Sequence, residues 1–346
     1  MAVTKETKSG DFDNASRQRA PQEIPILDRV NQDFLDQLAA ESGPPIYTLT
    51  PDEARSVLLR AQSGFARKPD AHVKDWNVVS GPYALRLRTI RPEHANDIDR
   101  GPVIIYFHGA GWVMGDATTH DRLVRELAVG ANATVVFVDY DRAPEHRYPV
   151  AVEEAYAATC YVSEHAQEFG VDATRLAVAG DSVGGNMATV VSLLTKQRSG
   201  PAIAGQILFY PVTNADFESG SYKQFADGPW LTRRAMQWFW DQYLPDHDKR
   251  KDPTASPLLA SREQLTGLPR ALIITAENDV LRDEGEAYGR KLIEAGVEVA
   301  TTRYNATIHD FLMLNALAEA APTRAAVAQA VDFLQSVLAP KPKRNP

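Results

Sequence analysis

The pattern of hydrophobic and polar residues along the chain changes near residue 76. Before that point, apolar residues recur at helical spacing over two stretches, 27–41 and 51–62, and we expect a helix in each. The second stretch follows Thr50 and carries a glutamate, Glu53, three residues later. A threonine and a glutamate at this spacing are typical of a capping box at a helix N-terminus.

Beyond residue 76, short apolar runs rich in β-branched residues alternate with amphipathic stretches. We expect strands at 103–107, 133–140, 175–180, 205–210, 271–276 and 297–304. Helical patterns such as 148–168, 184–197 and 281–295 lie between most of them. Apolar strands that alternate with helices predict an α/β fold, with a mostly parallel central sheet flanked by helices on both faces.

One interval interrupts this alternation. About 60 residues separate the run that ends at 210 from the run that begins at 271, which is too long for a simple crossover. We therefore expect an inserted cap over 212–258. It contains an aromatic cluster, Trp230, Trp238, Phe239 and Trp240. We expect most of these rings to pack in a cap helix, and lining of an acyl pocket is the alternative.

Charge and cysteine content exclude several classes of partner. The 346-residue chain has a net charge of −8 and no dense basic run apart from the tail KPKRNP, so nucleic acid and anionic membranes are poor partners. The single cysteine, Cys160, excludes an internal disulfide and a cysteine metal cage. Residues 1 to about 24 are polar and without a signal-peptide pattern, and no apolar run could span a membrane, so we expect a loose tail and a cytoplasmic protein.

The stretch VAGDSVGGN (178–186) places Ser182 between an expected strand and an expected helix. Gly180 and Gly184 flank the serine at two residues on either side, which gives the G-x-S-x-G pattern of a nucleophile elbow. A serine that only caps a helix is the alternative, but a cap does not need glycines on both sides. We expect Ser182 to be a catalytic nucleophile.

A serine at its ordinary pKa needs a neighbouring base, and enzymes with this elbow have the order serine, acid, histidine. Two histidines follow Ser182 in the chain. His247 lies in the polar stretch LPDHDKRKD, where we expect it to be solvated, whereas His309 follows the last expected strand. We expect His309 to be the base, with activity falling as it protonates near its ordinary pKa of about 6.5.

The stretch AENDVLRDEGEAY supplies the candidate acids. Asp279 comes directly after the strand expected at 271–276, whereas Asp283 comes four residues later, where a helix is expected to begin. Asp279 is the predicted acid, Asp283 is more typical of a first-turn helix charge, and Glu277 is a further candidate.

A glycine-rich segment, His108-Gly109-Ala110-Gly111, follows the strand expected at 103–107. In esterases a loop of this type brings backbone N–H groups together, and with the N–H of Val183 they would hold a developing negative oxygen. We expect His108 to pin the loop. A simple strand-to-helix turn is the alternative, but it would not require three small residues in a row.

Five segments together resemble one family. They are HGAGW (108–112), DYDRAPEHRYPVAVEEAY (139–156), GDSVGGN (180–186), DVLRDEG (279–285) and HDF (309–311). In this order, over roughly residues 76–338, the chain resembles the bacterial hormone-sensitive-lipase-like esterases of the α/β-hydrolase fold.

The resemblance implies a serine carboxylesterase that hydrolyses short-to-medium-chain acyl esters through an acyl-enzyme, without cofactor or metal. The site residues that it implies are a triad of Ser182, Asp279 and His309 and an oxyanion hole of Gly109, Ala110 and Val183. It also implies a helical cap built from the N-terminal helices and the insertion, with DYDRAPEH bracing the loops around the active site.

Three positions depart from the pattern of the family. Ala110 replaces a usual glycine, Val183 replaces a usual alanine, and HDF places Asp310 where HGF is usual. Backbone N–H groups are kept at all three positions, so the departures affect the size of the pocket rather than the class of reaction.

The predicted organisation divides the chain into four parts: 1–60, the tail and cap helices; 61–211, the first part of the core; 212–258, the cap insertion; and 259–346, the second part of the core. The expected partner is a small-molecule ester, and the oligomeric state stays open, with a homodimer as one option. An amidase or deacetylase with the same triad is an alternative function. A non-catalytic receptor such as the plant gibberellin receptors, in which the catalytic histidine is replaced, is disfavoured by His309.

Overall fold

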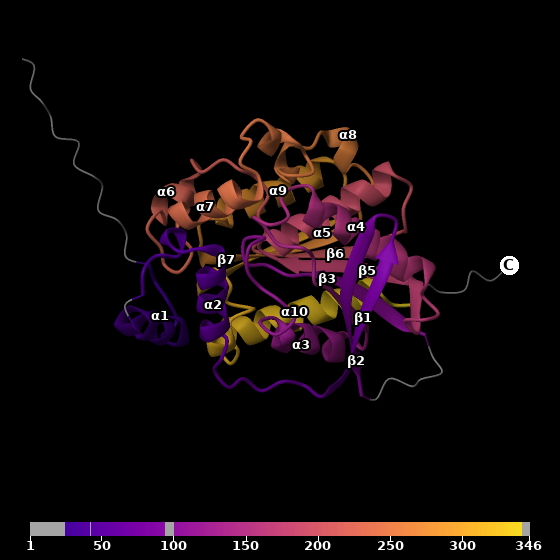
Figure 1. The fold of residues 1–346 in the computed structure, drawn as a ribbon, viewed down its shortest axis with the longest axis horizontal. Helices are drawn as coiled ribbons and strands as arrows, with labels where there is room; N and C mark the ends of the chain where they lie inside the picture. Colours follow the sequence, from indigo (N-terminus) through magenta and orange to yellow (C-terminus); the bar gives the residue numbers. More distant parts are fainter. Residues whose placement is uncertain (1–24, 42, 94–99, 341–346) are drawn as a thin grey trace, which may run out of the picture.

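The structure is a computed structural model that describes residues 25–41, 43–93 and 100–340. Residues 1–24, for which we expected a loose tail, and the C-terminal stretch KPKRNP lie outside the described residues. The described residues form one eight-stranded sheet of order β1-β2-β4-β3-β5-β6-β7-β8 (Figure 1). The strands are β1 (Ala71–Ser80), β2 (Tyr83–Pro92), β3 (Gly101–Phe107), β4 (Thr134–Val138), β5 (Val171–Asp181), β6 (Gly205–Phe209), β7 (Arg270–Asn278) and β8 (Val299–Ile308).

Helices cover both faces of this sheet (Figure 1). They are α1 (Arg29–Glu41), α2 (Pro51–Ala61), α3 (Asp121–Ala131), α4 (Val150–Glu164), α5 (Val183–Gln197), α6 (Gly220–Gln224), α7 (Arg233–Tyr243), α8 (Arg262–Leu265), α9 (Arg282–Glu294) and α10 (Ala321–Val337). Helices α3 and α10 lie on one face, and α4, α5 and α9 lie on the other. The predicted α/β fold is therefore confirmed.

Strands β3 to β8 run parallel to one another, and all six expected strands are present. Every residue of β4 and β6 is buried, as expected for strands that are covered on both faces. The hairpin of β1 and β2 was not predicted, and it joins the sheet antiparallel through the pairing of β2 with β4. Most residues of β1 are at least partly exposed, so its sequence lacks the apolar run that marks the other strands.

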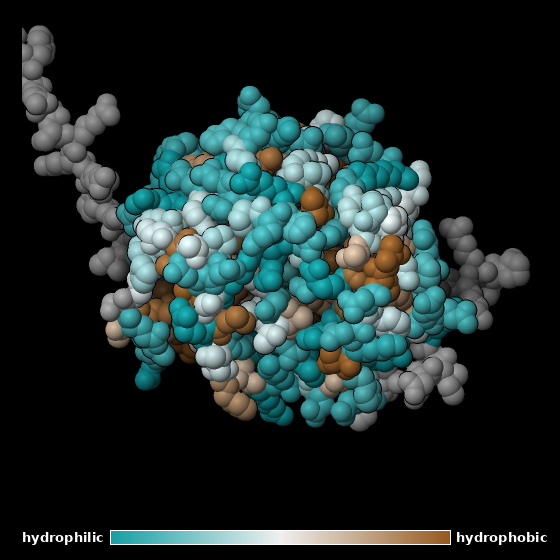
Figure 2. Space-filling view, viewed as in Figure 1, coloured by the Kyte–Doolittle hydropathy of each residue, from teal (hydrophilic) through white to brown (hydrophobic). Residues whose placement is uncertain are grey.

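The capping box predicted at the start of α2 is present. Thr50 N donates to Glu53 Oε2 at 2.8 Å, and Glu53 N donates to Thr50 Oγ1 at 3.4 Å. Helix α1 lies beyond α2 at the edge of the molecule, next to the segment that contains α6 and α7 (Figure 1). On the face shown in Figure 2, hydrophobic residues form small separate patches on a mostly hydrophilic surface.

The segment between β6 and β7 is anchored to the helix that follows Ser182. Asn186 of α5 donates through Nδ2 to the carbonyl oxygens of Val212 (3.1 Å) and Ala255 (2.9 Å). These two carbonyls lie near the two ends of the expected insertion, so one side chain holds both ends together. None of the helices in the described residues is long and apolar enough to cross a membrane.

Candidate active site

Ser182 stands on a sharp turn between β5 and α5. Its φ is +55° and its ψ is −118°, a conformation that costs a non-glycine residue free energy and is typical of functional sites. The turn is fixed on both sides of the serine, because Ser182 N donates to the carbonyl of Phe209 at 2.8 Å and Val212 N donates to the carbonyl of Ser182 at 3.1 Å. The end of β6 thus holds the strained residue in place.

The two glycines that flank Ser182 are required by close packing of backbone. A Cβ atom on Gly180 would overlap the carbonyl of Gly184, and a Cβ atom on Gly184 would overlap the carbonyl of Phe107 at the end of β3. Side chains at either position would therefore push apart the turn and the neighbouring strand. This packing explains why the serine needs glycine on both sides, which a helix cap does not.

His309 lies between Ser182 and Asp279. Its Nε2 is 3.1 Å from Ser182 Oγ, and its Nδ1 is 2.7 Å from Asp279 Oδ2. His309 directly follows β8, Ser182 follows β5 and Asp279 follows β7. The three residues therefore meet at the carboxyl edge of the parallel strands, where α/β sheets bind their ligands. All three are buried, with exposed fractions of 2% for the histidine, 3% for the serine and 1% for the aspartate.

The other candidate residues have different partners. Asp283, in the first turn of α9, accepts a hydrogen bond from Ser221 N at 2.7 Å. Glu277 accepts one from Ala306 N at 2.7 Å. The side chain of His247 is 77% exposed and lies 3.8 Å from a surface aspartate. Of the candidates drawn from the sequence, only Asp279 and His309 come together with the serine.

The surroundings of His309 make it a stronger base than a free histidine. Burial lowers the pKa of the imidazole, but the charges of Asp279 and Asp310 outweigh burial and raise that pKa to about 9. Burial also raises the pKa of Asp310, which directly follows the histidine. The ring of Tyr210 packs edge-on against the imidazole, with centroids 4.8 Å apart.

The loop after β3 turns through three consecutive residues with positive φ: Ala110 (+75°), Gly111 (+69°) and Trp112 (+59°). The N–H of Gly109, which we expected to face the substrate, instead donates to Asp181 Oδ1 at 3.1 Å. No described residue accepts a hydrogen bond from the N–H of Ala110 or Gly111. The N–H of Gly109 is therefore held by the protein itself, whereas the N–H groups of Ala110 and Gly111 have no acceptor among the described residues.

Val183, the other expected donor, is the first residue of α5. The N–H groups in the first turn of a helix have no partner within the helix and carry partial positive charge. Among the described residues none accepts a hydrogen bond from Val183 N. This N–H is next in the chain to Ser182, so it remains suited to an oxyanion hole.

A buried cluster around Asp181, which was not expected from the sequence, fixes the loop. Asp181 Oδ1 also accepts a hydrogen bond from Tyr106 Oη at 2.6 Å, and its Oδ2 lies 3.2 Å from His120 Nε2. Burial favours the neutral form of both partners, but their mutual attraction outweighs it, lowering the pKa of Asp181 and raising that of His120. The only signal in the sequence was the acidic residue directly before Ser182.

The segment DYDRAPEH braces the same loop, in agreement with the role that the resemblance implied. Arg142 Nη1 donates to the carbonyl of Gly115 at 2.8 Å, and Ala143 N donates to the carbonyl of Trp112 at 2.9 Å. Tyr140 Oη donates to the carbonyl of His108 at 3.0 Å, and its ring stacks on that imidazole. Both ends of the turning backbone are therefore tied to one segment.

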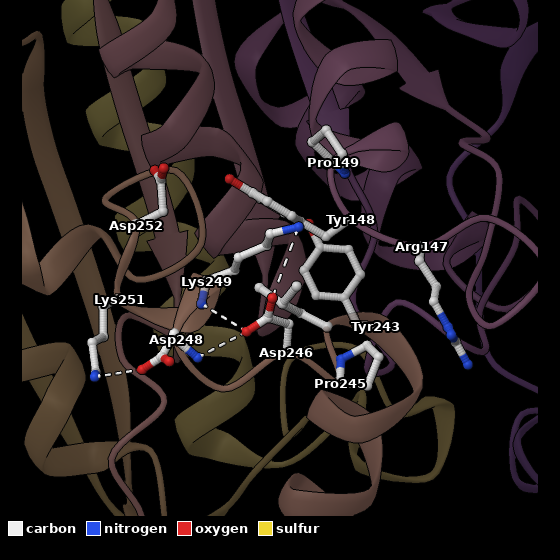
Figure 3. Close-up of a pocket in the computed structure, with 11 residues that line it drawn as sticks. Arg147, Tyr148, Pro149, Tyr243, Pro245, Asp246, Asp248, Lys249, Lys251 and Asp252 are labelled. Atoms are coloured by element: carbon white, nitrogen blue, oxygen red, sulfur yellow. Dashed lines mark hydrogen bonds and ion pairs between the residues drawn. The ribbon is translucent and has the colours of Figure 1, made fainter.

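The pocket in Figure 3 lies where α4 begins and α7 ends, and it is separate from the triad. Four of its charged side chains form ion pairs, Lys251 with Asp248 at 2.9 Å and Lys249 with Asp246 at 3.8 Å. None of its lining residues belongs to the triad or to the loop at 108–112.

A second groove, which we call the α1–α2 groove, has a volume of about 890 Å³. Its apolar lining residues include Phe34 and Leu38 of α1, Val57 of α2, and Trp230 of the insertion. Trp230 Nε1 donates to Asp310 Oδ2 at 2.9 Å. A residue that lines the α1–α2 groove is thus hydrogen-bonded to Asp310, which directly follows His309. Within the described parts of the chain, no cluster of histidine, cysteine or acidic side chains is arranged to hold a metal ion.

Comparisons with known proteins agree with this geometry. Residues 104–313 match the family described as alpha/beta hydrolase fold. Carboxylesterase NlhH of Mycobacterium tuberculosis (strain ATCC 25618 / H37Rv) is 43% identical over 305 residues, which cover 86% of this chain and 95% of that protein. Ethyl acetate hydrolase of Pseudomonas putida is 36% identical over 282 residues, which cover 80% of this chain and 88% of that protein.

The solved structures include a thermostable esterase from Pseudomonas putida ECU1011. It is 48% identical, with a TM-score of 0.90, over 92% of this chain and 99% of the other. Sheet, elbow and comparisons thus place the chain in the class of α/β hydrolases. Within that class, it belongs to the hormone-sensitive-lipase-like esterase family and is a carboxylic ester hydrolase.

Proposed function

We propose that the chain hydrolyses short-to-medium-chain carboxylic esters with Ser182 as nucleophile, His309 as general base and Asp279 as the orienting acid. The observation that carries this proposal is the continuous array from Ser182 Oγ to His309 Nε2 (3.1 Å) and from His309 Nδ1 to Asp279 Oδ2 (2.7 Å). This array matches the arrangement in which a histidine takes a proton from a serine while a carboxylate fixes its tautomer.

In the first half of the reaction, Ser182 Oγ attacks the carbonyl carbon of the ester while His309 Nε2 takes the hydroxyl proton. The carboxylate of Asp279 stabilises the imidazolium that forms. The carbonyl oxygen becomes negative, and the N–H groups of Ala110, Gly111 and Val183 would donate to it. The tetrahedral intermediate then collapses, the ester C–O bond breaks, and His309 gives its proton to the leaving alcohol.

In the second half, a water molecule takes the place of the alcohol. His309 removes a proton from this water as its oxygen attacks the acyl carbon, and the same N–H groups hold the second negative oxygen. Collapse breaks the bond between the acyl carbon and Ser182 Oγ, and the proton on His309 returns to the serine. The carboxylic acid leaves, and the enzyme is regenerated.

The short acyl range rests on enclosure of the nucleophile. Ser182 is nearly fully buried, and a Cβ atom on Gly111 would overlap the ring of Phe239 from α7, so the insertion closes directly over the loop. The relative from Pseudomonas putida is named ethyl acetate hydrolase, and ethyl acetate has two carbons on either side of the ester oxygen. A closely covered site and a relative of this kind both favour short acyl groups.

The experiment is a panel of nitrophenyl esters of graded acyl length, with matching anilides, on the wild type and the Ser182→Ala variant. We expect ester turnover that is fastest for the shorter acyl groups and lost by about 10⁴-fold or more in the variant. Ser192→Ala is the matched control, because Ser192 is a buried serine in α5 that donates to the carbonyl of Ala188. Anilides cleaved faster than esters would favour the amidase or deacetylase alternative.

A serine-directed phosphonate locates the nucleophile independently of turnover. Mass spectrometry of the digested adduct should find the label on Ser182 alone. A label on another serine, or wild-type turnover in Ser182→Ala, would refute the assignment of the elbow.

A further inference from the structure

Asp310 touches the catalytic base and the insertion at the same time. Its Oδ1 lies 3.3 Å from His309 Nε2, and its Oδ2 accepts the hydrogen bond from Trp230 Nε1 at 2.9 Å. This is the position at which HDF departs from the HGF pattern. The departure therefore places a carboxylate beside the nitrogen that exchanges protons with Ser182.

The backbone and the packing direct this carboxylate toward the histidine. Asp310 has a φ of +65°, a left-handed conformation that aspartate and asparagine adopt more readily than most residues. The residue is buried, and its Oδ1 has no hydrogen-bond partner among the described residues. The nearest group of opposite charge that Oδ1 can meet is thus the imidazolium of His309.

Trp230 holds Oδ2, the second carboxylate oxygen of Asp310, through its hydrogen bond from Nε1. It precedes α7, has a φ of +61°, and its ring packs against Phe34 of α1 with centroids 5.4 Å apart. Arg234, one turn further on, lies over the ring of Tyr47 at 4.3 Å. The position of the Trp230 indole, and with it the carboxylate of Asp310, therefore depends on how the insertion and the N-terminal helices sit together.

We propose that Asp310 is a positioning residue that Trp230 holds against His309 Nε2, so that the strength of the catalytic base depends on the seating of the insertion and α1. This inference rests on the proposed roles of Ser182 and His309. With Trp230 in place, carboxylates flank both nitrogens of the imidazole, Asp279 at Nδ1 and Asp310 at Nε2.

The consequence for catalysis has two parts. Two nearby carboxylates stabilise the imidazolium that forms when Ser182 gives up its proton, which makes His309 a stronger base. At lower pH, however, the protonated histidine pairs with Asp310 at the nitrogen that should accept the serine proton. The enzyme is then held in an inactive form that only higher pH releases.

Four other titratable groups face His309 and Asp310, each from a different segment of the chain. They are Asp181 at the end of β5, Asp279 after β7, Tyr210 after β6 and His120 before α3. The insertion contacts Asp310 through the uncharged ring of Trp230, and α1 reaches it indirectly, through the ring of Phe34 that packs on Trp230. The variants below leave the four titratable groups unchanged.

The first test variant is Asp310→Asn, which keeps the size of the side chain, tolerates the left-handed backbone and retains an oxygen for the Trp230 N–H. We expect the acid limb of kcat/KM to move to lower pH by at least about one unit, which is a tenfold larger neutral fraction of His309 well below its pKa. The plateau rate at high pH should fall, because a weaker base transfers the proton less readily.

The second variant, Trp230→Phe, keeps a ring against Phe34 and removes the N–H that holds Asp310. We expect the acid limb to move in the same direction as in Asp310→Asn, and the double variant to show no further shift, since the two residues act through one contact. Trp238→Phe is the matched control, because Trp238 is a second tryptophan of the insertion, in α7, and its ring contacts Phe239 rather than the triad. Its acid limb should match the wild type.

The readout is the rate of inactivation by diethyl nitrophenyl phosphate from about pH 6 to about pH 10, which reports activation of the serine without later steps. The proposal is overturned if the acid limb of Asp310→Asn coincides with the wild type. The proposal is also overturned if Trp230→Phe leaves the acid limb in place. The same holds if Trp230→Phe shifts the acid limb by the same amount in the wild type and in the Asp310→Asn variant. Circular dichroism and a melting curve verify folding, and Trp230→Phe carries the test alone if Asp310→Asn does not fold.

Failure of the proposed triad looks different in the same assay. Ser182→Ala would then still be labelled by the phosphate ester. If Ser182→Ala is inert and the acid limb of Asp310→Asn has not moved, the triad stands and only the role of Asp310 is refuted.

Discussion

Asp279 Oδ2 lies 2.7 Å from His309 Nδ1, and a proton on Nδ1 that is shared with this carboxylate leaves Nε2, on the side of Ser182, free to accept one. Asp279→Asn keeps the shape of the side chain but reverses the hydrogen bond, and the imidazole then has the wrong tautomer. We expect kcat to fall by up to about 10⁴-fold with little change in KM. Steady-state kinetics on a short nitrophenyl ester measure this effect.

Asp283→Asn is the control for the acid. The carboxylate of Asp283 accepts from Ser221 N and from Arg282, so its loss should affect the junction of α6 and α9 and not the imidazole. A loss of kcat in Asp283→Asn larger than in Asp279→Asn would move the acid to Asp283.

A second prediction concerns pH. Because Asp279 and Asp310 raise the pKa of His309 to about 9, the imidazole stays protonated, and unable to act as base, up to that range. Activity should therefore be half of its plateau where the pH equals this pKa of about 9, rise to the plateau above it, and fall tenfold in kcat/KM per pH unit well below it. The expectation from the sequence, an acid limb near about 6.5, holds only for a histidine in water.

His247→Gln is the control for this profile, since the side chain of His247 is largely exposed and distant from the triad. The acid limb should stay where it is in the wild type. Disappearance of the limb in His247→Gln would show that the wrong histidine was assigned.

Some features of the site could be predicted from the sequence, and others depend on the three-dimensional arrangement. The meeting of Ser182, Asp279 and His309 was predictable because each of them follows a strand with a clear apolar run, and the strand order brings those ends together. The pKa of His309 could not be predicted from the sequence, because it depends on the position of the Asp310 carboxylate. That carboxylate lies beside His309 Nε2 on a residue of positive φ, and it is held by Trp230, a residue 80 positions away.

The donors of the oxyanion hole show the same limit. The sequence located the loop at 108–111, but which N–H groups face the substrate depends on φ at each residue and on Asp181, which takes the N–H of Gly109. The hairpin of β1 and β2 was missed for another reason. Edge strands such as β1 are partly solvated, so they do not need the apolar pattern by which strands are recognised.

A third prediction tests the loop. Gly111 has a φ of +69°, and a methyl group there would overlap the ring of Phe239, so Gly111→Ala should displace the backbone that presents the N–H groups. Loss of one oxyanion donor costs about 10²- to 10³-fold in kcat, and we expect a loss of this size. Steady-state kinetics and a melting curve together separate a loss of rate from a loss of folding.

Gly267→Ala is the matched control, because Gly267 has a φ of +78° and nothing lies within 4 Å of the added methyl group. It carries the same backbone strain without the collision. An equal loss of kcat in Gly267→Ala would show that strain, and not the displaced loop, lowers the rate.

The last prediction concerns α1, which contacts the loop that carries His309. Asn31 Oδ1 accepts a hydrogen bond from the N–H of Ile308 at 3.3 Å, directly before His309. Phe34 packs on Trp230, and the carbonyl of Ile26 accepts from Asn278 Nδ2 at 3.0 Å, directly before Asp279. Helix α1 and the residues before it thus support the backbone next to His309 and Asp279, two members of the proposed triad.

Deleting residues 2–45 removes all three contacts and exposes the apolar side of the insertion, which favours aggregation. Any soluble product should keep the sheet but lose about 10²-fold in kcat/KM, the size expected when supporting contacts no longer position the reacting groups, and its selectivity for acyl length should weaken. Deleting residues 2–20 is the control, since it leaves Ile26, Asn31 and Phe34 in place, and it should change neither rate nor melting temperature. If the longer truncation matched the full-length enzyme in rate, solubility and acyl-length profile, α1 would have no part in positioning the base or closing the site.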